Sequence, residues 1–446
     1  MSRVIIPLCY DHHSHLSYSI LLSQCRSLAG IHDRDECLAI VAQACADNCS
    51  RPLTLVTGWQ SGNLPLTAAD LASLPPVIVL NYCLHGFLIN EAASEYTRSR
   101  GLELSNVTVL DEERSMADLF AFFGSFGQIS SEELGLVADS HLRKLRQKGL
   151  YGCTDMLQLC PESARDWAAS CSFPIASWIY PQDIVARNRK LTEPKDRRSD
   201  HNELSQHGSL VTSYAHTSCG DRPLSSSRRC NDTRWKLFGD GAIGARTAAL
   251  ADGFLDGGTP TLVFADAELE ECLYRCYTEP GIGAEVAYHA IGELAIEQVL
   301  RAYSLVRWRL LPVTTPRLRL EHVQFITLAQ AHAAKSLGIT LCMQPNFSED
   351  SLSYTDRLTP AQCRANNPFR MLIDEAGFVP GKDLIFGSDG MPSGMTAALQ
   401  NALFPPFDEQ KLTIPELLAG YSADPARGTM EFIIDTDKRL VSPANN

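Results

Sequence analysis

The sequence lacks several features that would place it in other classes of protein. Its longest hydrophobic run near the N-terminus, residues 4–10, is too short to cross a membrane and lacks a signal-peptide cleavage pattern. No basic stripe offsets the net charge of −13, so the charge disfavours binding to a nucleic-acid backbone. No segment repeats with a fixed period. We therefore expect neither a membrane nor a nucleic acid as a partner.

The sequence also lacks any Cys-x-x-Cys pair, although it contains 15 cysteines. The closest pairs, Cys45/Cys49 and Cys272/Cys276, have helical spacing rather than the spacing of a metal site. In a chain of this size without a signal peptide, scattered cysteines are typical of reduced, mostly buried thiols. We expect a cytoplasmic protein.

The composition is that of a globular protein. The chain has 446 residues, of which 45% are hydrophobic and 20% are charged, so it can bury a large core. Short apolar stretches alternate with longer amphipathic ones, which favours a parallel α/β fold. Strands are expected at residues 3–10, 53–57, 77–82, 152–156, 174–180, 234–239, 285–289, 317–322, 339–344 and 383–388. Helices are expected at residues 68–73, 132–148, 266–278, 292–304, 327–337 and 360–376.

One segment, residues 192–233, differs from the rest. It is rich in Ser, Arg, Asp, His and Asn and has few large apolar residues. Such a segment buries too little surface to offset the entropy lost on ordering. We interpret it as a polar insertion or mobile loop between two strands, which limited trypsin should cut first.

Side chains that bind metals occur at the ends of five expected strands. His13 and His15 follow the first strand and, being two residues apart, face the same side, whereas His12 faces the other. Lys236 lies among Trp, Leu and Phe, where poor hydration favours a neutral amine that can add carbon dioxide and form a carbamate. A lysine whose ammonium extends to solvent at the strand end is the alternative.

Three further strand ends carry His289, His322 and Asp389. Each histidine, taken singly, is also compatible with a hydrogen-bonded core residue, and the aspartate with a helix cap. Taken in order, all these residues fit a (β/α)₈ barrel, where the carboxyl ends of the strands form the active-site face. Imidazoles with one carboxylate suit one or two divalent transition-metal ions, with zinc the leading candidate. A barrel needs only eight strands, so we expect one or two strands around residues 53–82 to lie outside it.

These motifs resemble the amidohydrolase superfamily, and within it the family 3 branch that includes N-substituted formamide deformylases. The residues that carry the resemblance are 11–15 (DHHSH), 236–250 (KLFGDGAIGARTAAL), 289–292 (HAIG), 320–324 (LEHVQ), 343–345 (MQP) and 387–389 (GSD). The stretch 236–250 is the most specific, because it indicates the branch rather than the superfamily. Weaker similarity includes Gly58-Trp59 and residues 85–90.

The resemblance implies a role for each motif residue. His13 and His15 would bind one metal ion, and Lys236, as a carbamate, would bridge to a second ion bound by His289 and His322. Asp389 would bind the bridging water and act as the proton shuttle. His85 and Gln344 would contact the substrate.

The resemblance also sets the expected domains. Residues 1–427 would form a TIM barrel, with residues 428–446 as a C-terminal tail. Because the chain starts at the first barrel strand and its tail lacks the family's usual return, the accessory β-sandwich is expected to be absent or vestigial.

The expected activity is cleavage of a non-peptide carbon–nitrogen bond in a small amide-type substrate by metal-activated water. A lactonase or esterase, or a decarboxylase, on the same barrel is one alternative. A catalytically silent binding protein is another. A homo-oligomer is compatible with the sequence.

Overall fold

The computed structural model describes most of the chain in two compact units. The described residues are 1–23, 25–49, 52–60, 64–81, 87–99, 131–156, 173–178, 184, 234–258, 260–279, 285–311 and 315–444. The larger unit comprises residues 1–17, 131–158 and 162–446, and the smaller comprises residues 18–130 with 159–161. The expected insertion at residues 192–233 and the candidate His85 lie outside the described residues. No helix among the described residues is long and apolar enough to cross a membrane.

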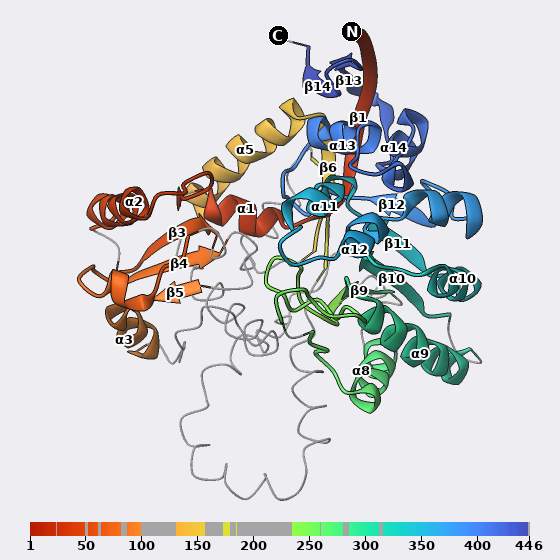
Figure 1. Ribbon diagram of the computed structural model, residues 1–446, viewed down its shortest axis with the longest axis horizontal. Coiled ribbons are helices and arrows are strands. Elements are labelled where there is room, and N and C mark those ends of the chain that lie inside the picture. The colour runs from red at the N-terminus through yellow and green to blue at the C-terminus, as the bar shows by residue number, and fades with distance from the viewer. Residues whose placement is uncertain are drawn as a thin grey trace, which may run out of the picture. The chain divides into compact units, whose positions relative to one another are not determined.

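The larger unit is built on parallel strands that follow one another along the sequence (Figure 1). In one sheet β6 pairs in parallel with β7 and with the second half of β1, and in the other β8 to β12 pair in parallel in chain order. The strands are β1 (Ser2–Ser14), β6 (Leu150–Asp155), β7 (Ile175–Ser177), β8 (Arg234–Phe238), β9 (Glu285–Ala290), β10 (Arg317–His322), β11 (Thr340–Met343) and β12 (Leu384–Phe386).

Helices follow most of these strands, as expected for parallel connections. The helices α8, α9 and α10 lie along the outer side of β9 to β11 (Figure 1). The helices of this unit are α5 (Ser131–Gln147), α8 (Asp266–Thr278), α9 (Glu293–Leu310), α10 (Leu328–Ser336), α11 (Asp350–Ser353), α12 (Pro360–Ala365), α13 (Met395–Leu403) and α14 (Ile414–Gly420). Short 3₁₀ segments are η3 (Pro345–Glu349) and η5 (Asp408–Gln410), and η4 (Met371–Glu375) is a π-helical turn.

The expected helix at residues 360–376 is wrong as a single element. α12 ends at Ala365, and the chain then passes through Asn367, whose φ is +50°, before η4 begins. Pro368 explains the break, because proline removes a backbone donor and disfavours helical geometry in the residue before it.

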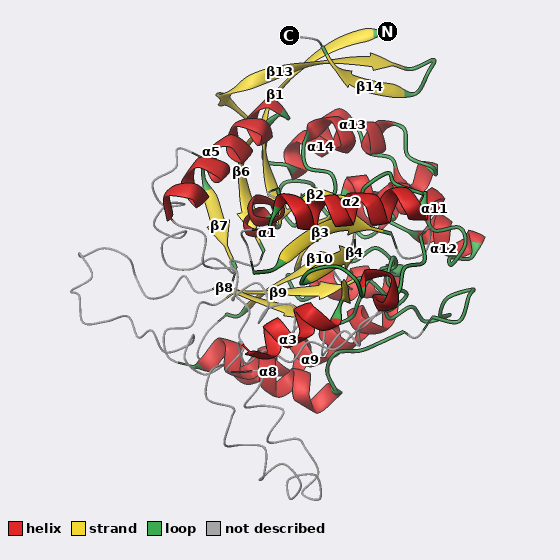
Figure 2. Ribbon diagram, turned by 90° about the vertical axis from the view of Figure 1, so that its left-hand side faces the viewer, coloured by secondary structure: helices red, strands yellow, loops and turns green. Residues whose placement is uncertain are grey.

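The C-terminal segment is part of a sheet, which corrects the boundary expected at residue 427. β13 (Asp424–Asp435) crosses that boundary and pairs antiparallel with the first half of β1, and β14 (Leu440–Pro443) pairs with β13. Figure 2 shows these three strands together, with both chain ends beside them. Phe432 and Val441 are buried there, so burial of apolar side chains fixes the segment in place. The vestigial sandwich stays a prediction.

The smaller unit contains a separate sheet in the order β2-β3-β4-β5. This confirms that the strands expected near residues 53–82 lie outside the main set. Its elements are α1 (Leu16–Leu22, which begins in the larger unit), β2 (Arg26–Ser27), α2 (Arg34–Asp47), β3 (Thr54–Trp59), η1 (Ala68–Leu71), β4 (Val77–Asn81), β5 (Phe87–Ile89) and α3 (Glu91–Ser99). The expected helix at residues 68–73 is the 3₁₀ turn η1.

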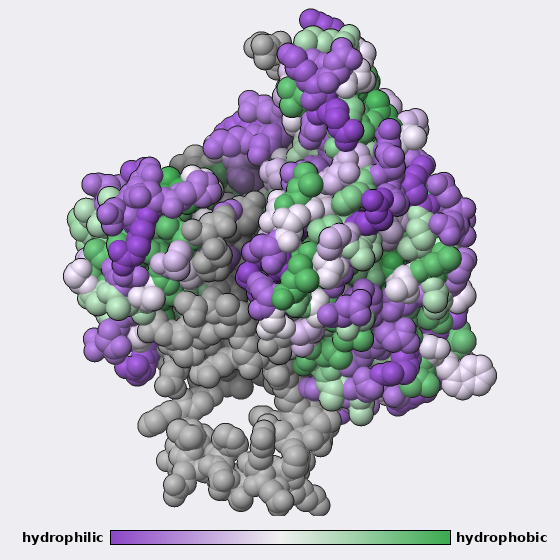
Figure 3. Space-filling view, viewed as in Figure 1, coloured by the Kyte–Doolittle hydropathy of each residue, from purple (hydrophilic) through white to green (hydrophobic). Residues whose placement is uncertain are grey.

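Apolar side chains fill the interior, and the exposed side chains are mixed. On the face drawn in Figure 3, hydrophilic and hydrophobic residues of the larger unit are interspersed. Many cysteines are buried, as the sequence predicts: Cys9, Cys37, Cys45, Cys153, Cys272, Cys276, Cys342 and Cys363.

Candidate metal centre

Of the six residues that the sequence predicts as metal ligands, five are buried and His15 is partly exposed. All six lie in, or just after, five strands of the larger unit. The imidazole rings of His13 and His15 are 5.4 Å apart, and His12 faces the other way, with its Nε2 2.8 Å from the hydroxyl of Ser422. The ring of His322 lies 4.8 Å from that of His13 and 4.4 Å from that of His289. The structure therefore brings the four expected histidines into one chain of neighbouring rings.

Asp389 completes the group formed by His13 and His15. Its Oδ1 lies 3.2 Å from Nε2 of His13 and 2.9 Å from Nε2 of His15. The ligand atoms of these three residues lie within 4.8 Å of one another. Two ligands each about 2 Å from a tetrahedral ion lie roughly 3.3 Å apart, so the three side chains fit a shared divalent ion.

The backbone around Asp389 explains how its carboxylate comes so close to β1. The amides of Ser388 and Asp389 both donate to the carbonyl of His13, at 3.0 and 2.7 Å, and so join the end of β12 to β1. A Cβ on Gly387 would lie 2.2 Å from the backbone nitrogen of His13, so only glycine permits this approach.

Asp389 does not cap a helix. The next helix, α13, begins only at Met395, and the amide of Gly390 donates to the Ser388 hydroxyl. The alternative interpretation of Asp389 as a helix cap therefore has no support.

Two site residues have strained backbones at the ends of their strands. His322 has a φ of +70° and Asp389 a φ of +56°, in the left-handed region. Such conformations cost about 1–3 kcal/mol each and persist where the surrounding contacts impose them. Here they turn both side chains toward His13 just where the strands end.

Three of the four histidines have one ring nitrogen beside an oxygen acceptor, which leaves the other nitrogen for a metal ion. Nδ1 of His13 donates to the carboxylate of Glu321 at 2.6 Å, which leaves Nε2 on the side of Asp389. Nδ1 of His322 is 2.8 Å from the amide oxygen of Gln344, and Nε2 of His289 is 3.0 Å from the carbonyl of Gly241. Histidines that bind metals are commonly oriented in this way.

Lys236 is fully buried and makes no hydrogen bond through Nζ among the described residues. Burial lowers the pKa of Lys236 to about 8, although the charges of Glu321 and Asp389 act to raise it. A buried amine without a hydrogen-bond partner is an unusual group for a protein interior, and its lowered pKa makes the neutral form easier to reach. The alternative of a lysine extending to solvent is therefore wrong.

The charges of the site depend on one another. Burial alone would raise the pKa of Asp389, but His13 and His15 hold it well below its usual range. Burial lowers the pKa of His322 well below its usual range, so that ring is neutral. For His13, the effect of burial is outweighed by Asp389 and Glu321, which raise its pKa.

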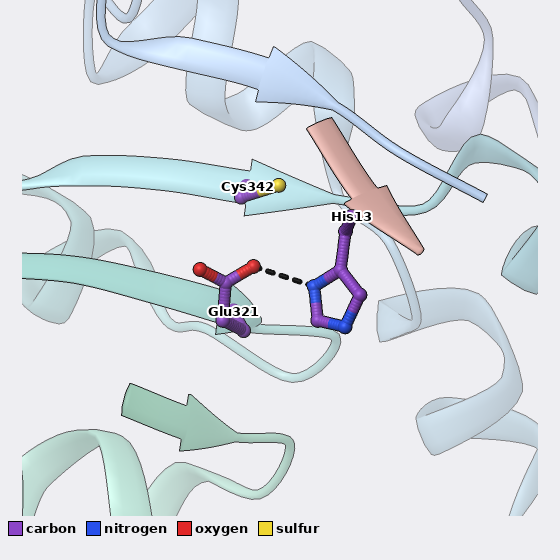
Figure 4. Close-up of side chains that lie close together, drawn as sticks. All are labelled: His13, Glu321 and Cys342. Carbon is purple, nitrogen blue, oxygen red and sulfur yellow. Dashed lines mark hydrogen bonds and ion pairs between the residues drawn. The ribbon is translucent and has the colours of Figure 1, made fainter. Parts of the chain in front are cut away.

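A second group of candidate ligands, His13, Glu321 and Cys342, lies beside the first (Figure 4). Glu321 and His13 point toward one another, and both oxygens of Glu321 also accept from the guanidinium of Arg319. The Glu321 oxygens are already occupied by His13 and Arg319, and burial raises the pKa of the Cys342 thiol well above its usual range. This group therefore orients His13 rather than forming a separate metal site.

Sequence reasoning did not assign roles to three carboxylates that organise the site. Besides Glu321, Asp240 accepts from the amides of Ala249, Ile291 and Gly292 and so fixes the loop of the 236–250 motif beside His289. Asp11 accepts from the amides of His13 and Ser388. Asp240 and Glu321 lie inside the quoted motifs, and Asp11 begins one, so the motifs contained the signal without the role.

Gln344, expected as a substrate contact, is fully buried. Its side chain contacts His322, and its carbonyl accepts from Asn367. A substrate role for Gln344 stays a prediction.

Comparison with known proteins agrees with the motifs. The model of the amidohydrolase family, branch 3, matches residues 2–429. The chain belongs to this family. A curated relative, the candidate amidohydrolase YtcJ of Bacillus subtilis (strain 168), is 33% identical over 142 residues. That match covers 31% of this chain and 26% of YtcJ, so the chain spans only about a quarter of the relative's length.

Solved structures match over nearly the whole chain. An uncharacterised metal-dependent hydrolase from Pyrococcus furiosus has a TM-score of 0.62 at 18% identity, covering 94% of this chain and 81% of that one. A second, from Pyrococcus horikoshii OT3, has a TM-score of 0.61 at 17% identity, covering 96% and 79%. At these identities the likeness shows the fold, an α/β fold consistent with the TIM-barrel superfamily.

Proposed function

We propose that this amidohydrolase-family chain is a metal-dependent hydrolase that cleaves a non-peptide carbon–nitrogen bond. The observation that supports it most strongly is the meeting of Asp389 with His13 and His15 beside the neighbouring rings of His322 and His289. We also propose that β1 and β6 to β12 close as a (β/α)₈ barrel. The amide bonds from the end of β12 to His13 support closure on one side.

One or two divalent transition-metal ions, with zinc the leading candidate, would bind to the side chains present. His13, His15 and Asp389 would bind one ion, and His289 and His322 the other. Lys236 as a carbamate would lie between them, and its buried amine, which has no hydrogen-bond partner within the described ranges, supports this assignment. The solved structures that share the fold are named as metal-dependent hydrolases, which is consistent with this proposal.

The bound metal would lower the pKa of a water from about 15.7 toward about 7, which supplies a nucleophile at neutral pH. Asp389 would act as the general base, because its carboxylate lies beside the proposed metal position and can accept the proton of the water. The protonated Asp389 would then donate that proton to the leaving nitrogen, which as an anion would be a poor leaving group. Glu321 and Gln344 would keep His13 and His322 in one orientation throughout.

Metal analysis and a substrate screen test the proposal. The purified protein should contain about one or two equivalents of transition metal, and removal with a chelator should abolish turnover. Small amides should be hydrolysed faster than matched lactones and esters. A protein that binds no metal would contradict the proposal. Faster cleavage of lactones than of amides would show that lactones, and not amides, are the substrate class.

A further inference from the structure

The two histidines at the centre of the site are oriented by acceptors of different charge. Nδ1 of His13 lies 2.6 Å from the Glu321 carboxylate, and Nδ1 of His322 lies 2.8 Å from the neutral amide oxygen of Gln344. All four side chains are buried, with Glu321 and Gln344 fully inaccessible. Solvent therefore screens both interactions only weakly, and the difference in charge matters more than it would at the surface.

Arg319 holds Glu321 in its charged form and in one place. Its guanidinium donates to both oxygens of Glu321 and also to the carbonyl of His12 at 2.8 Å. The same guanidinium lies 5.0 Å from the ring centroid of Trp178. Breaking such a buried pair is costly, so Glu321 stays ionised beside His13.

A carboxylate and an amide do not affect an imidazole equally. A hydrogen bond to an ionised acceptor is roughly twice as strong as a neutral one, and it leaves the opposite nitrogen a better electron donor. His13 also shares its group with an anionic side chain, Asp389, whereas His322 and His289 adjoin each other. Both differences act in the same direction.

We infer that Glu321, held by Arg319, makes the His13–His15–Asp389 group the tighter of the two metal positions, and that the His289–His322 position is weaker. Glu321 is thus a positioning residue that sets the order in which the metal positions fill. The inference rests on the proposed function only in requiring that the site binds metal.

The wild-type protein gives the first test. Metal-stripped protein is titrated with zinc in competition with a chromophoric chelator, and crystals grown with one equivalent of zinc are examined by anomalous diffraction. The ion should lie among His13, His15 and Asp389. An ion between His289 and His322 overturns the inference while leaving the proposed function intact. A protein that binds no zinc contradicts the proposed function instead.

Two variants test the role of Glu321. Glu321→Gln keeps the size and removes the charge, and the double variant Arg319→Met with Glu321→Gln avoids leaving a buried guanidinium unpaired. Loss of a partner of this kind typically weakens metal binding by about 10–100-fold. We expect this loss at the tighter position, formed by His13, His15 and Asp389. The dissociation constant of the weaker position should change by less than about threefold.

The control is Glu431→Gln, which breaks the exposed pair of Glu431 with Arg3 on the β1–β13 sheet. It should leave both zinc affinities unchanged. The inference is overturned if a folded Glu321 variant keeps the dissociation constant of the tighter zinc position within about threefold of wild type. It is also overturned if zinc affinity falls equally at both positions. If neither variant folds, the position of the ion in the wild-type crystal decides.

Discussion

The substitution Asp389→Asn should remove the proton acceptor of this site while leaving its structure unchanged. The backbone of Asp389 has a φ of +56°, and asparagine adopts this left-handed conformation more readily than most residues. The amide of residue 389 can still donate to the carbonyl of His13, at 2.7 Å in the structure. The substitution therefore keeps the turn, the size of the side chain and one oxygen ligand, and removes the carboxylate that accepts the proton.

The expected loss follows from that single change. Loss of a general base typically lowers the rate by about 10²- to 10⁴-fold. At about 1.36 kcal/mol per factor of ten, this corresponds to roughly 3–5 kcal/mol of transition-state stabilisation. The loss should appear in kcat rather than in KM, because the binding surface is unchanged. Metal content should fall only modestly, since His13 and His15 remain.

The assay is steady-state kinetics on the best amide found in the screen, with metal content and the unfolding midpoint measured on the same preparation. Asp435→Asn is a matched control, because Asp435 is also buried but lies on β13 and accepts from the amide of Lys438. Asp389→Asn with metal bound and kcat within about threefold of wild type would refute the role of Asp389 as the proton shuttle.

Three further predictions follow from individual contacts. Lys236→Met should lower the metal content below that of wild type, measured by elemental analysis, and an unchanged content would exclude a bridging carbamate at Lys236. Gly387→Ala should destabilise the fold by about 1–3 kcal/mol or more in denaturant unfolding, because its Cβ would lie 2.2 Å from the His13 nitrogen. Burial raises the pKa of Asp350 to about 7, so the free energy of unfolding should fall as pH rises from about 4 to 7. Asp350→Asn should therefore gain stability relative to wild type as the pH rises from about 4 to 7, and a constant difference over that range would show that the pKa of Asp350 is not raised.

Much of the fold could be predicted from the sequence, because strand periodicity and spacing are local properties. All ten expected strands are present, and the two expected outside the main set, β3 and β4, lie in the sheet of the smaller unit. The C-terminal strands β13 and β14 were not expected. In β13 the apolar residues Phe432 and Ile434 alternate over a short stretch, and the partner of β13 is the start of β1, more than 400 residues earlier. No local signal encodes a pairing at that distance.

The helix at residues 360–376 shows the opposite error. The apolar periodicity continues through Asn367-Pro368, so it predicts one helix, although the structure ends α12 at Ala365. Proline geometry outweighed the periodicity, and the Pro368 in the sequence was a sufficient warning.

The site shows why motifs predict ligands better than the residues that orient them. On a regular strand, Glu321 and His322 would face opposite sides, so a pattern that assigns His322 to the site assigns Glu321 away from it. In the structure both side chains adjoin His13: Glu321 from within β10, and His322 because its φ of +70° turns the chain at the strand end. Backbone strain of this kind is set by tertiary contacts, such as the bond from the amide of Val323 to the carbonyl of Ala290, and not by the residues at the position itself. Alternation along the strand therefore predicts His322 as a ligand but does not predict that Glu321 orients His13.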